Sequence, residues 1–164
     1  CVMKFYSAEE YQPQCHALFE HYQSKIQALL PNVHIEHIGA SSIPNAISKG
    51  DLDIYIAVTQ AEFDEAISKL HTLNFQEKSE TLRTNQLCML ESLNHDDVAF
   101  QLVVKGSEFE SFILFRDSLR QSTELVQQYN TLKRQSVGLN MQDYRQEKNV
   151  FIARVLSQTL KNKQ

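Results

Sequence analysis

Apolar residues along the chain follow the periods of helices and strands in turn. The clearest strand is 51–58, where Leu52, Ile54, Ile56 and Val58 alternate with other residues and share one face. In chain order the expected elements are a helix over 8–30, strands over 33–38 and 51–58, a helix over 61–73, strands over 75–77, 86–93 and 97–104, and helices over 108–122, 123–137 and 141–161. A helix, a mixed α/β core and a helical tail in this order indicate an α+β fold with a central mixed β-sheet flanked by helices.

Residue types suited to helix ends support several of these boundaries. Ser7 and Glu10 have the spacing of a capping box at the start of the first helix, and Asn140 suits the cap of the last one. The stretch 39–50 is rich in turn-forming residues, and we expect one short helix in it with Pro44 in the first turn.

Length and composition are those of an ordinary folded protein. The chain has 164 residues, of which 42% are hydrophobic and 22% are charged, so its apolar content can offset the entropy lost on folding. No stretch approaches about 18 uncharged apolar residues, which excludes a membrane-spanning helix and a membrane partner. We expect one compact unit, with an α/β core at 1–107 and a helical portion at 108–164 packed on that core.

The metal-binding and redox residue types are few. The three cysteines, Cys1, Cys15 and Cys88, are too scattered for a disulfide framework or a zinc site. His34 and His37 share a strand, but no cysteine or acid completes a set of four zinc ligands with them. We therefore expect buried structural thiols and a reducing, cytoplasmic location.

The most informative segment joins a turn to a pair of aspartates. Gly39-Ala40-Ser41-Ser42 lies between a strand and an expected short helix, a place where backbone N–H groups and hydroxyls can hold phosphate oxygens. Asp51 and Asp53 follow about ten residues later and begin the strand 51–58. Each feature alone is common in turns and strand starts, and their order and spacing together carry the signal.

The two aspartates have the arrangement of a metal site. A separation of two residues on a strand puts both carboxylates on the same face. Neighbouring carboxylates repel each other, and a divalent cation keeps both of them ionised. Carboxylate oxygens with open water positions suit Mg²⁺ or Mn²⁺. A cation held by Asp51 and Asp53 beside a phosphate-holding turn is what phosphoryl-transfer chemistry needs.

These residues resemble a known superfamily. Gly-[Gly/Ala]-Ser followed by Asp-x-Asp is similar to the signature of the nucleotidyltransferases, which include DNA polymerase beta, poly(A) polymerase and the small antibiotic nucleotidyltransferases. The chain more closely resembles the GrpB family of predicted nucleotidyltransferases over nearly its whole length. The matching segments are His37-Ile38-Gly39-Ala40-Ser41-Ser42-Ile43-Pro44, Lys49-Gly50-Asp51-Leu52-Asp53, Phe115-Arg116-Asp117 with Leu119-Arg120, Tyr129-Asn130-Thr131-Leu132-Lys133, and Tyr144 through Lys148-Asn149-Val150-Phe151-Ile152.

The resemblance implies a nucleotidyltransferase-like fold and a reaction. A nucleotidyl group would pass from a nucleoside triphosphate, with Mg²⁺ or Mn²⁺, to a hydroxyl of a small molecule, a protein or a nucleic acid end. Gly39, Ser41 and Ser42 would hold the phosphates, and Asp51 and Asp53 would hold the metal. The alternatives are a catalytically weak or inactive nucleotide-binding or regulatory module, and a protein-interaction domain that inherited the fold.

The chain departs from the superfamily pattern at a third carboxylate. That group usually lies on a neighbouring strand, which here is 97–104. By alternation Asp97, Ala99, Gln101 and Val103 share one face of it. Gln101 resembles the family's polar position, but an amide cannot act as a base. Asp97 is the nearest acidic candidate for the third catalytic group, or else only part of a hairpin turn.

The charges of the chain are divided between its two parts. Residues 1–104 carry 6 Lys+Arg and 14 Asp+Glu, a net −8, whereas residues 105–164 carry 10 and 6, a net +4. A basic surface for long nucleic acids is therefore not indicated. Lys49, Lys133 and Lys148 are candidate phosphate contacts, or else solvated and paired cations. The division predicts a metal–nucleotide cleft between an acidic core and basic helices.

Overall fold

The computed structural model describes residues 4–162 and has the α+β architecture that the sequence predicts. Its helices are α1 (Ala8–Leu29), α2 (Phe63–His71), α3 (Ser111–Arg120), α4 (Thr123–Gln135) and α5 (Met141–Asn162). Its strands are β1 (His34–Ile38), β2 (Leu52–Val58), β3 (Phe75–Glu77), β4 (Leu87–Ser92) and β5 (Val98–Val104). Three short 3₁₀ helices are η1 (Ala40–Ser42), η2 (Gln60–Glu62) and η3 (Glu108–Glu110).

The five strands form one mixed sheet in the order β1-β2-β5-β4-β3. The central pair β2 and β5 runs parallel, and the other neighbouring pairs run antiparallel. In the parallel pair Asp53 lies abreast of Ala99, and Tyr55 abreast of Gln101. This register decides which side chains of β5 face the candidate site.

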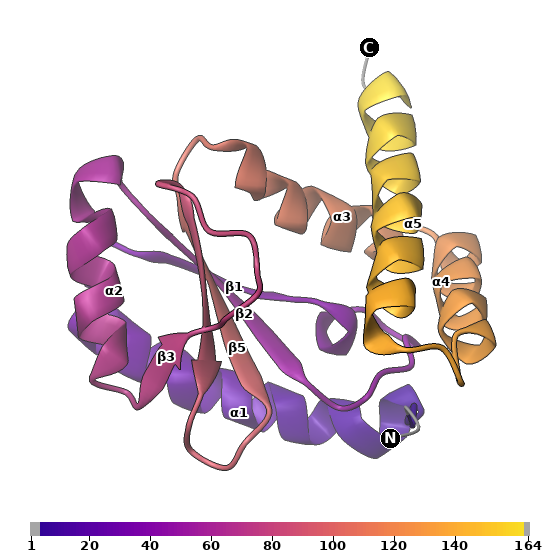
Figure 1. Cartoon of the computed structure of the whole chain (residues 1–164), viewed down its shortest axis with the longest axis horizontal. Helices are drawn as coiled ribbons and strands as arrows, with labels where there is room; N and C mark the ends of the chain where they lie inside the picture. The colour runs from indigo at the N-terminus through magenta and orange to yellow at the C-terminus, as the bar shows by residue number, and fades with distance from the viewer. Residues whose placement is uncertain (1–3, 163–164) are drawn as a thin grey trace.

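Helices α1 and α2 pack on one face of the sheet, and η3 and α3 pack on the other (Figure 1). The main core lies between the sheet and helices α1 and α2, and it contains Leu52 and Ile54 of β2 and Phe100 of β5. On the opposite face, η3 and α3 cover Tyr55, Ala57 and their neighbours through Phe109. That cover reaches the later part of β2, and the residues that begin β2 lie beyond it.

The C-terminal helices form a third cluster at one end of the sheet (Figure 1). Phe115 of α3, Tyr129 of α4 and Phe151 of α5 pack there against Ile43 and Ala46. The apolar stripes of the three helices are therefore buried against the turn-rich stretch 39–50. This packing brings α4 and α5 to the same end of the sheet as the aspartate pair.

Local signals in the sequence fix most helix ends. The Ser7 amide donates to Glu10 Oε1 at 3.0 Å, and the Asp143 amide donates to the cap Asn140 at 2.8 Å. The expected position of the short helix is wrong: the turn of helix is Ala40–Ser42 and Pro44 follows it. The glycine at position 39 starts the turn earlier than the proline suggested.

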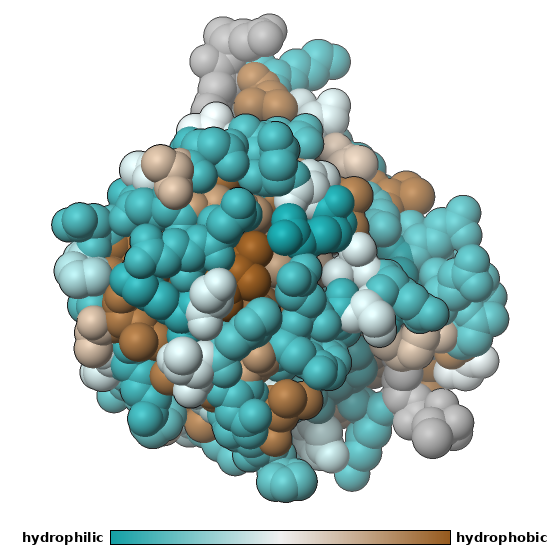
Figure 2. All heavy atoms as spheres, turned by 60° about the vertical axis from the view of Figure 1, so that its left-hand side comes forward, coloured by the Kyte–Doolittle hydropathy of each residue, from teal (hydrophilic) through white to brown (hydrophobic). Residues whose placement is uncertain are grey.

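The cysteines and the surface agree with a folded globular chain. Cys15 and Cys88 are buried free thiols, and Cys1 lies outside the described residues. Seen from the α2 side, the surface is mostly hydrophilic, with apolar residues in small separate patches (Figure 2). Among the described residues no helix combines the length and apolar character needed to cross a bilayer.

Candidate metal and nucleotide site

A glycine turn and a pair of aspartates meet at the start of β2. Gly39 has φ +76°, and a Cβ built on it would lie 2.6 Å from Asp53 Oδ2. Both facts require glycine, since L side chains rarely adopt this φ and no heavy atom tolerates that approach. The absence of a side chain at Gly39 thus lets the turn pack directly against the Asp53 carboxylate.

Asp51 and Asp53 lie side by side on the face that α1 does not cover. Leu52 between them points into the core under α1 and is fully buried. Ser48 Oγ donates to Asp51 Oδ1 at 3.2 Å, and Gln101 Nε2 donates to Asp53 Oδ1 at 3.4 Å. Each carboxylate is oriented through one oxygen by these contacts.

The pKa values of the two aspartates are pushed apart. Burial, and then the charge of Asp51, raise the pKa of Asp53 to about 6. Burial acts in the same sense on Asp51, but Lys148 and Lys49 outweigh it, and the pKa of Asp51 lies below its usual value. A divalent cation would relieve the repulsion that raises the pKa of Asp53. Paired carboxylate oxygens with mutual repulsion fit Mg²⁺ or Mn²⁺.

Asp97 lies next to the pair but further out. Its carbonyl accepts the Leu52 amide at 2.9 Å, so Asp97 is abreast of Asp51 on the neighbouring strand. The side chain is exposed; partial burial and then the charge of Asp51 raise its pKa. Within residues 4–162, no three His, Cys, Asp or Glu side chains are grouped closely enough to hold a metal ion. The role of Asp97 as third ligand or base stays a prediction.

The two serines of the turn are buried and already hydrogen-bonded. Ser42 Oγ donates to the Gly39 carbonyl at 2.6 Å, and Ser41 Oγ lies 2.7 Å from His37 Nε2. Burial, then His16 and two arginines, lower the pKa of His37 to about 4. His37 is therefore neutral near pH 7, and its Nε2 either donates to Ser41 or accepts from it.

His37 was not expected to act on the turn. The sequence reasoning weighed this residue only as a metal ligand, but its ring stacks on Phe19 with centroids 5.0 Å apart and reaches Ser41. The signal for this contact is the spacing of four residues between a histidine at a strand end and a serine in the following turn.

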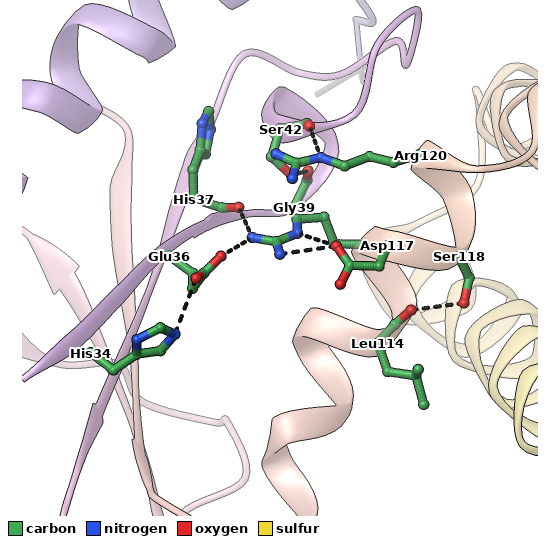
Figure 3. Close-up of polar contacts among 10 residues, drawn as sticks. His34, Glu36, His37, Gly39, Ser42, Leu114, Asp117, Ser118 and Arg120 are labelled. Atoms are coloured by element: carbon green, nitrogen blue, oxygen red, sulfur yellow. Dashed lines mark hydrogen bonds and ion pairs between the residues drawn. The ribbon is translucent and has the colours of Figure 1, made fainter.

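Arg116 of α3 is hydrogen-bonded to residues near the end of β1. Its guanidinium donates to Glu36 at 2.5 Å, to the His37 carbonyl at 2.9 Å and to Asp117 at 2.9 Å. Figure 3 shows Glu36, His37 and Asp117 around this point, with Gly39 close by. The Arg116 side chain is 8% exposed, so it is bound within the chain and not offered to a ligand.

Replacing Arg116 should therefore lower the free energy of unfolding more than replacing a residue of an exposed ion pair does. In Arg116→Met, Glu36 and the His37 carbonyl lose their donor, and we expect a loss of about 2–3 kcal/mol, below the cost of a fully buried pair because Glu36 is 28% exposed. Urea unfolding measures it. Lys69→Met is the control, because it removes an exposed helix pair with Glu65 and should cost less than about 0.5 kcal/mol. Equal losses would contradict this role.

Side chains of α3 and α1 also contact the stretch 39–50. Arg120 of α3 donates to the Ser42 carbonyl at 2.9 Å (Figure 3). From the other side, Gln12 of α1 donates to the Ile43 carbonyl at 2.8 Å. The stretch has little regular structure of its own, and these side chains supply the partners that its carbonyl groups need.

Lys133 and Asn130 of α4 hold the segment just before the aspartates. Lys133 Nζ donates to the Ile47 carbonyl at 2.6 Å and lies 4.0 Å from the centre of the Tyr129 ring. Asn130 Oδ1 accepts the Ile47 amide at 2.9 Å. Burial and then the charge of Lys148 lower the pKa of Lys133 to about 7. Lys133 thus supports the backbone at Ile47 and also interacts electrostatically with the two aspartates.

Lys148 on α5 and Lys49 just before β2 both interact electrostatically with the aspartates. Tyr129, Tyr144 and then the two aspartates raise the pKa of Lys148 on α5, which keeps it a cation. Lys49 is exposed and helps to lower the pKa of Asp51. Among the cations of the C-terminal helices, Lys133 and Lys148 therefore lie close enough to interact electrostatically with the aspartates, and the predicted metal–nucleotide cleft stays a prediction.

The fold is similar to that of nucleotidyltransferases. The solved structure of the RNA terminal uridylyl transferase Cid1 superposes with a TM-score of 0.54 at 9% identity, over 76% of this chain and 40% of Cid1. A structure of Cid1 with MgGTP bound gives a TM-score of 0.51 at 12% identity, over 70% of this chain and 37% of Cid1. At this identity the likeness establishes the fold alone.

The chain belongs to the GrpB family. The model of that family, described as GrpB protein, matches residues 7–158. A UPF0157 protein of Vibrio cholerae is 56% identical over 95% of this chain and 83% of its own length, and one of Deinococcus radiodurans is 25% identical over 85% and 74%. The crystal structure of the conserved protein GrpB from Enterococcus faecalis superposes with a TM-score of 0.80 at 21% identity, over 97% of this chain and 98% of that one.

Proposed function

We propose that this protein binds a nucleoside triphosphate with Mg²⁺ or Mn²⁺ and transfers its nucleotidyl group to a hydroxyl acceptor. The acceptor is a small molecule, a protein or a nucleic acid end. One observation carries the proposal: two repelling carboxylates begin β2 directly against a glycine turn, with the cations of Lys148 and Lys49 close by. Nucleotidyltransferases that share the fold support it, since one of them has been solved with MgGTP bound.

The residues divide the work of such a reaction. Asp51 and Asp53 would hold the cation, which when bound would supply positive charge to the triphosphate. Gly39 lets the turn lie directly against Asp53, so a triphosphate on the cation would meet the backbone of the turn. Ser41 and Ser42 would exchange their present hydrogen bonds, to His37 and to the Gly39 carbonyl, for bonds to phosphate oxygens. The acceptor oxygen forms a bond to the α-phosphorus, the bond to the β-phosphate oxygen breaks, and pyrophosphate leaves.

Charged side chains around the turn stabilise the leaving group. Lys148 and Lys49 carry the positive charge that pyrophosphate needs as it departs, and Lys133 adds to it while bracing the turn. Asp97, abreast of Asp51, accepts the proton of the acceptor hydroxyl or passes it to water. Its raised pKa makes it a better base than an ordinary aspartate.

The second candidate is a nucleotide-binding module without catalysis. Gln101 favours it, because an amide contacts Asp53 at the place where a carboxylate could serve as base. Such a module would use the same turn and the same cation, and it would not release pyrophosphate. The two candidates thus share a binding step and differ in turnover.

A panel of nucleoside triphosphates with and without Mg²⁺ tests both candidates. A ligand at about 100 times its Kd should stabilise the protein by about 2.7 kcal/mol, which appears as a rise in Tm by differential scanning fluorimetry. We expect the rise with triphosphate and Mg²⁺ together, and a smaller one with either alone. Pyrophosphate release, measured by a coupled assay with candidate acceptors, then separates the enzyme from the binding module.

The outcomes distinguish three readings. A shift with pyrophosphate release supports the transferase, and a shift without release across the acceptor panel supports the binding module. No shift with any triphosphate contradicts both and favours a protein-interaction domain. Asp64→Asn, which alters an exposed carboxylate on α2 outside the candidate site, is the control for a general charge effect.

A further inference from the structure

Gln101 reaches across the sheet to the carboxylate of Asp53. It lies on β5 between Tyr55 of β2 and Met89 of β4. The residue directly abreast of Asp53 is Ala99, whose methyl group leaves room on that side. The Gln101 side chain passes over this small residue, and its Nε2 donates to Asp53 Oδ1 at 3.4 Å.

The other end of the same amide has no partner. Gln101 Oε1 is fully buried, and no hydrogen-bond donor lies within reach of it. A buried carbonyl oxygen without a donor costs about 1–3 kcal/mol, a cost that an apolar side chain such as that of Met89 would not incur. The fold alone therefore does not account for an amide at this position, whereas its contact with Asp53 does.

The charges near Asp53 determine how the neutral amide of Gln101 affects cation binding. Asp51 and Asp53 supply two negative charges at the strand start, and the exposed Asp97 adds a third further out beside Asp51. Lys148, Lys49 and Lys133 all act electrostatically on one or both of the paired aspartates. Two divalent cations about 4 Å apart, as in two-metal phosphoryl-transfer sites, need bridging anionic ligands between them. With an amide beside Asp53 and lysines facing it, the charge balance accommodates one cation.

We propose that Gln101 sets the number of divalent cations at this site: it limits the site to a single cation held by Asp51 and Asp53, and a carboxylate at position 101 admits a second. The inference rests on the proposed function, because it concerns the same cation site. Gln101 acts here as a positioning residue, since it orients Asp53 through a hydrogen bond and adds no charge.

Counting bound Mn²⁺ tests this without reference to activity. We expect isothermal titration calorimetry, and electron paramagnetic resonance of free Mn²⁺, to give one cation per wild-type chain and two per chain in Gln101→Glu. Gln101→Met keeps the length and removes the amide, and it should bind one cation about 10-fold or more weakly. If Gln101→Glu does not fold, the shorter Gln101→Asp gives the same comparison.

The chain offers a matched control on the same sheet. Gln76 Nε2 on β3 donates to Glu91 Oε1 on β4 at 3.0 Å, another amide–carboxylate pair between neighbouring strands. Gln76→Glu adds the same charge there and should leave the count at one. A count of one in Gln101→Glu or Gln101→Asp, or two in the wild type, overturns the role of Gln101. Absence of Mn²⁺ binding by the wild type contradicts the proposed function itself.

Discussion

Asp53→Asn should abolish Mg²⁺-dependent nucleotide turnover and make the metal-free protein more stable. The amide keeps the shape of the carboxylate but contributes no charge to hold a cation, so we expect turnover to fall by at least about 100-fold, since even the loss of an outer partner of a metal ligand costs 10–100-fold. Stability should rise because burial and the charge of Asp51 both oppose ionisation of Asp53. Pyrophosphate release and thermal unfolding measure the two effects.

The gain in stability should depend on pH with a definite sign. The pKa of Asp53 is raised from 3.8 to about 6 in the folded chain, so ionised Asp53 lowers the free energy of unfolding, fully above about pH 6 and not at all below about pH 4. The stability of Asp53→Asn relative to the wild type should therefore grow between pH 4 and pH 6 and then level off. Urea unfolding across this range, with a metal chelator present, follows the difference.

One outcome would contradict the role of Asp53 as a cation ligand, and a second variant serves as a comparison. Turnover by Asp53→Asn at the wild-type rate means that the carboxylate does not hold the cation. Asp97→Asn is the comparison, since Asp97 is exposed and lies abreast of Asp51. It should slow turnover if it acts as the base, while leaving the binding of triphosphate and Mg²⁺ intact.

Regular patterns let most of the fold be predicted from the sequence. The alternation in β2 and the stripe of α1 reflect burial of one face, and that periodicity is local. The sheet order is not local: the parallel pairing of β2 with β5 depends on a crossover that passes through η2, α2, β3 and β4. The fold class could be predicted from the order of elements, whereas the register that sets Asp53 against Ala99 could not.

The candidate site was predictable where one short segment carries it and less so where distant elements meet. Gly39 and the aspartate pair lie within fifteen residues of one another, and motif spacing is enough to single them out. Lys133 shows the limit of this reasoning. The sequence makes Lys133 a candidate phosphate contact or else a solvated or paired cation. In the fold its amine is buried and donates to the Ile47 carbonyl, a contact that only the packing of α4 creates.

The two arginines of α3 also have roles that the sequence alone does not predict. Arg116 and Arg120 are four residues apart and therefore share one face of α3, and a guanidinium group can bind phosphate. In the fold they bind Glu36, the His37 carbonyl and the Ser42 carbonyl instead. A cation on a helix can serve a ligand or the chain's own carbonyl groups, and sequence alone does not say which of these it meets.

Gly39→Ala should both destabilise the protein and disable the site. The methyl group would lie 2.6 Å from Asp53 Oδ2 and 3.1 Å from Asp53 Cβ, so the turn or the β2 carboxylate must move. The backbone adds strain, because φ is +76° and non-glycine residues there cost about 1–3 kcal/mol. We expect a total loss of about 2–4 kcal/mol and Mg²⁺-dependent triphosphate binding weakened by at least about 10-fold.

The effect of backbone strain can be separated from the contact with Asp53. Gly106 has a similar φ of +82° and nothing within 4 Å of a Cβ built on it, so Gly106→Ala carries the strain without the collision. It should lose stability and keep triphosphate binding, as measured by urea unfolding and by the Mg²⁺-dependent rise in Tm. If Gly39→Ala keeps wild-type binding, the close approach of the turn to Asp53 does not position the phosphates. If the two variants lose binding equally, the loss comes from weakened folding, and the turn has no particular part in it.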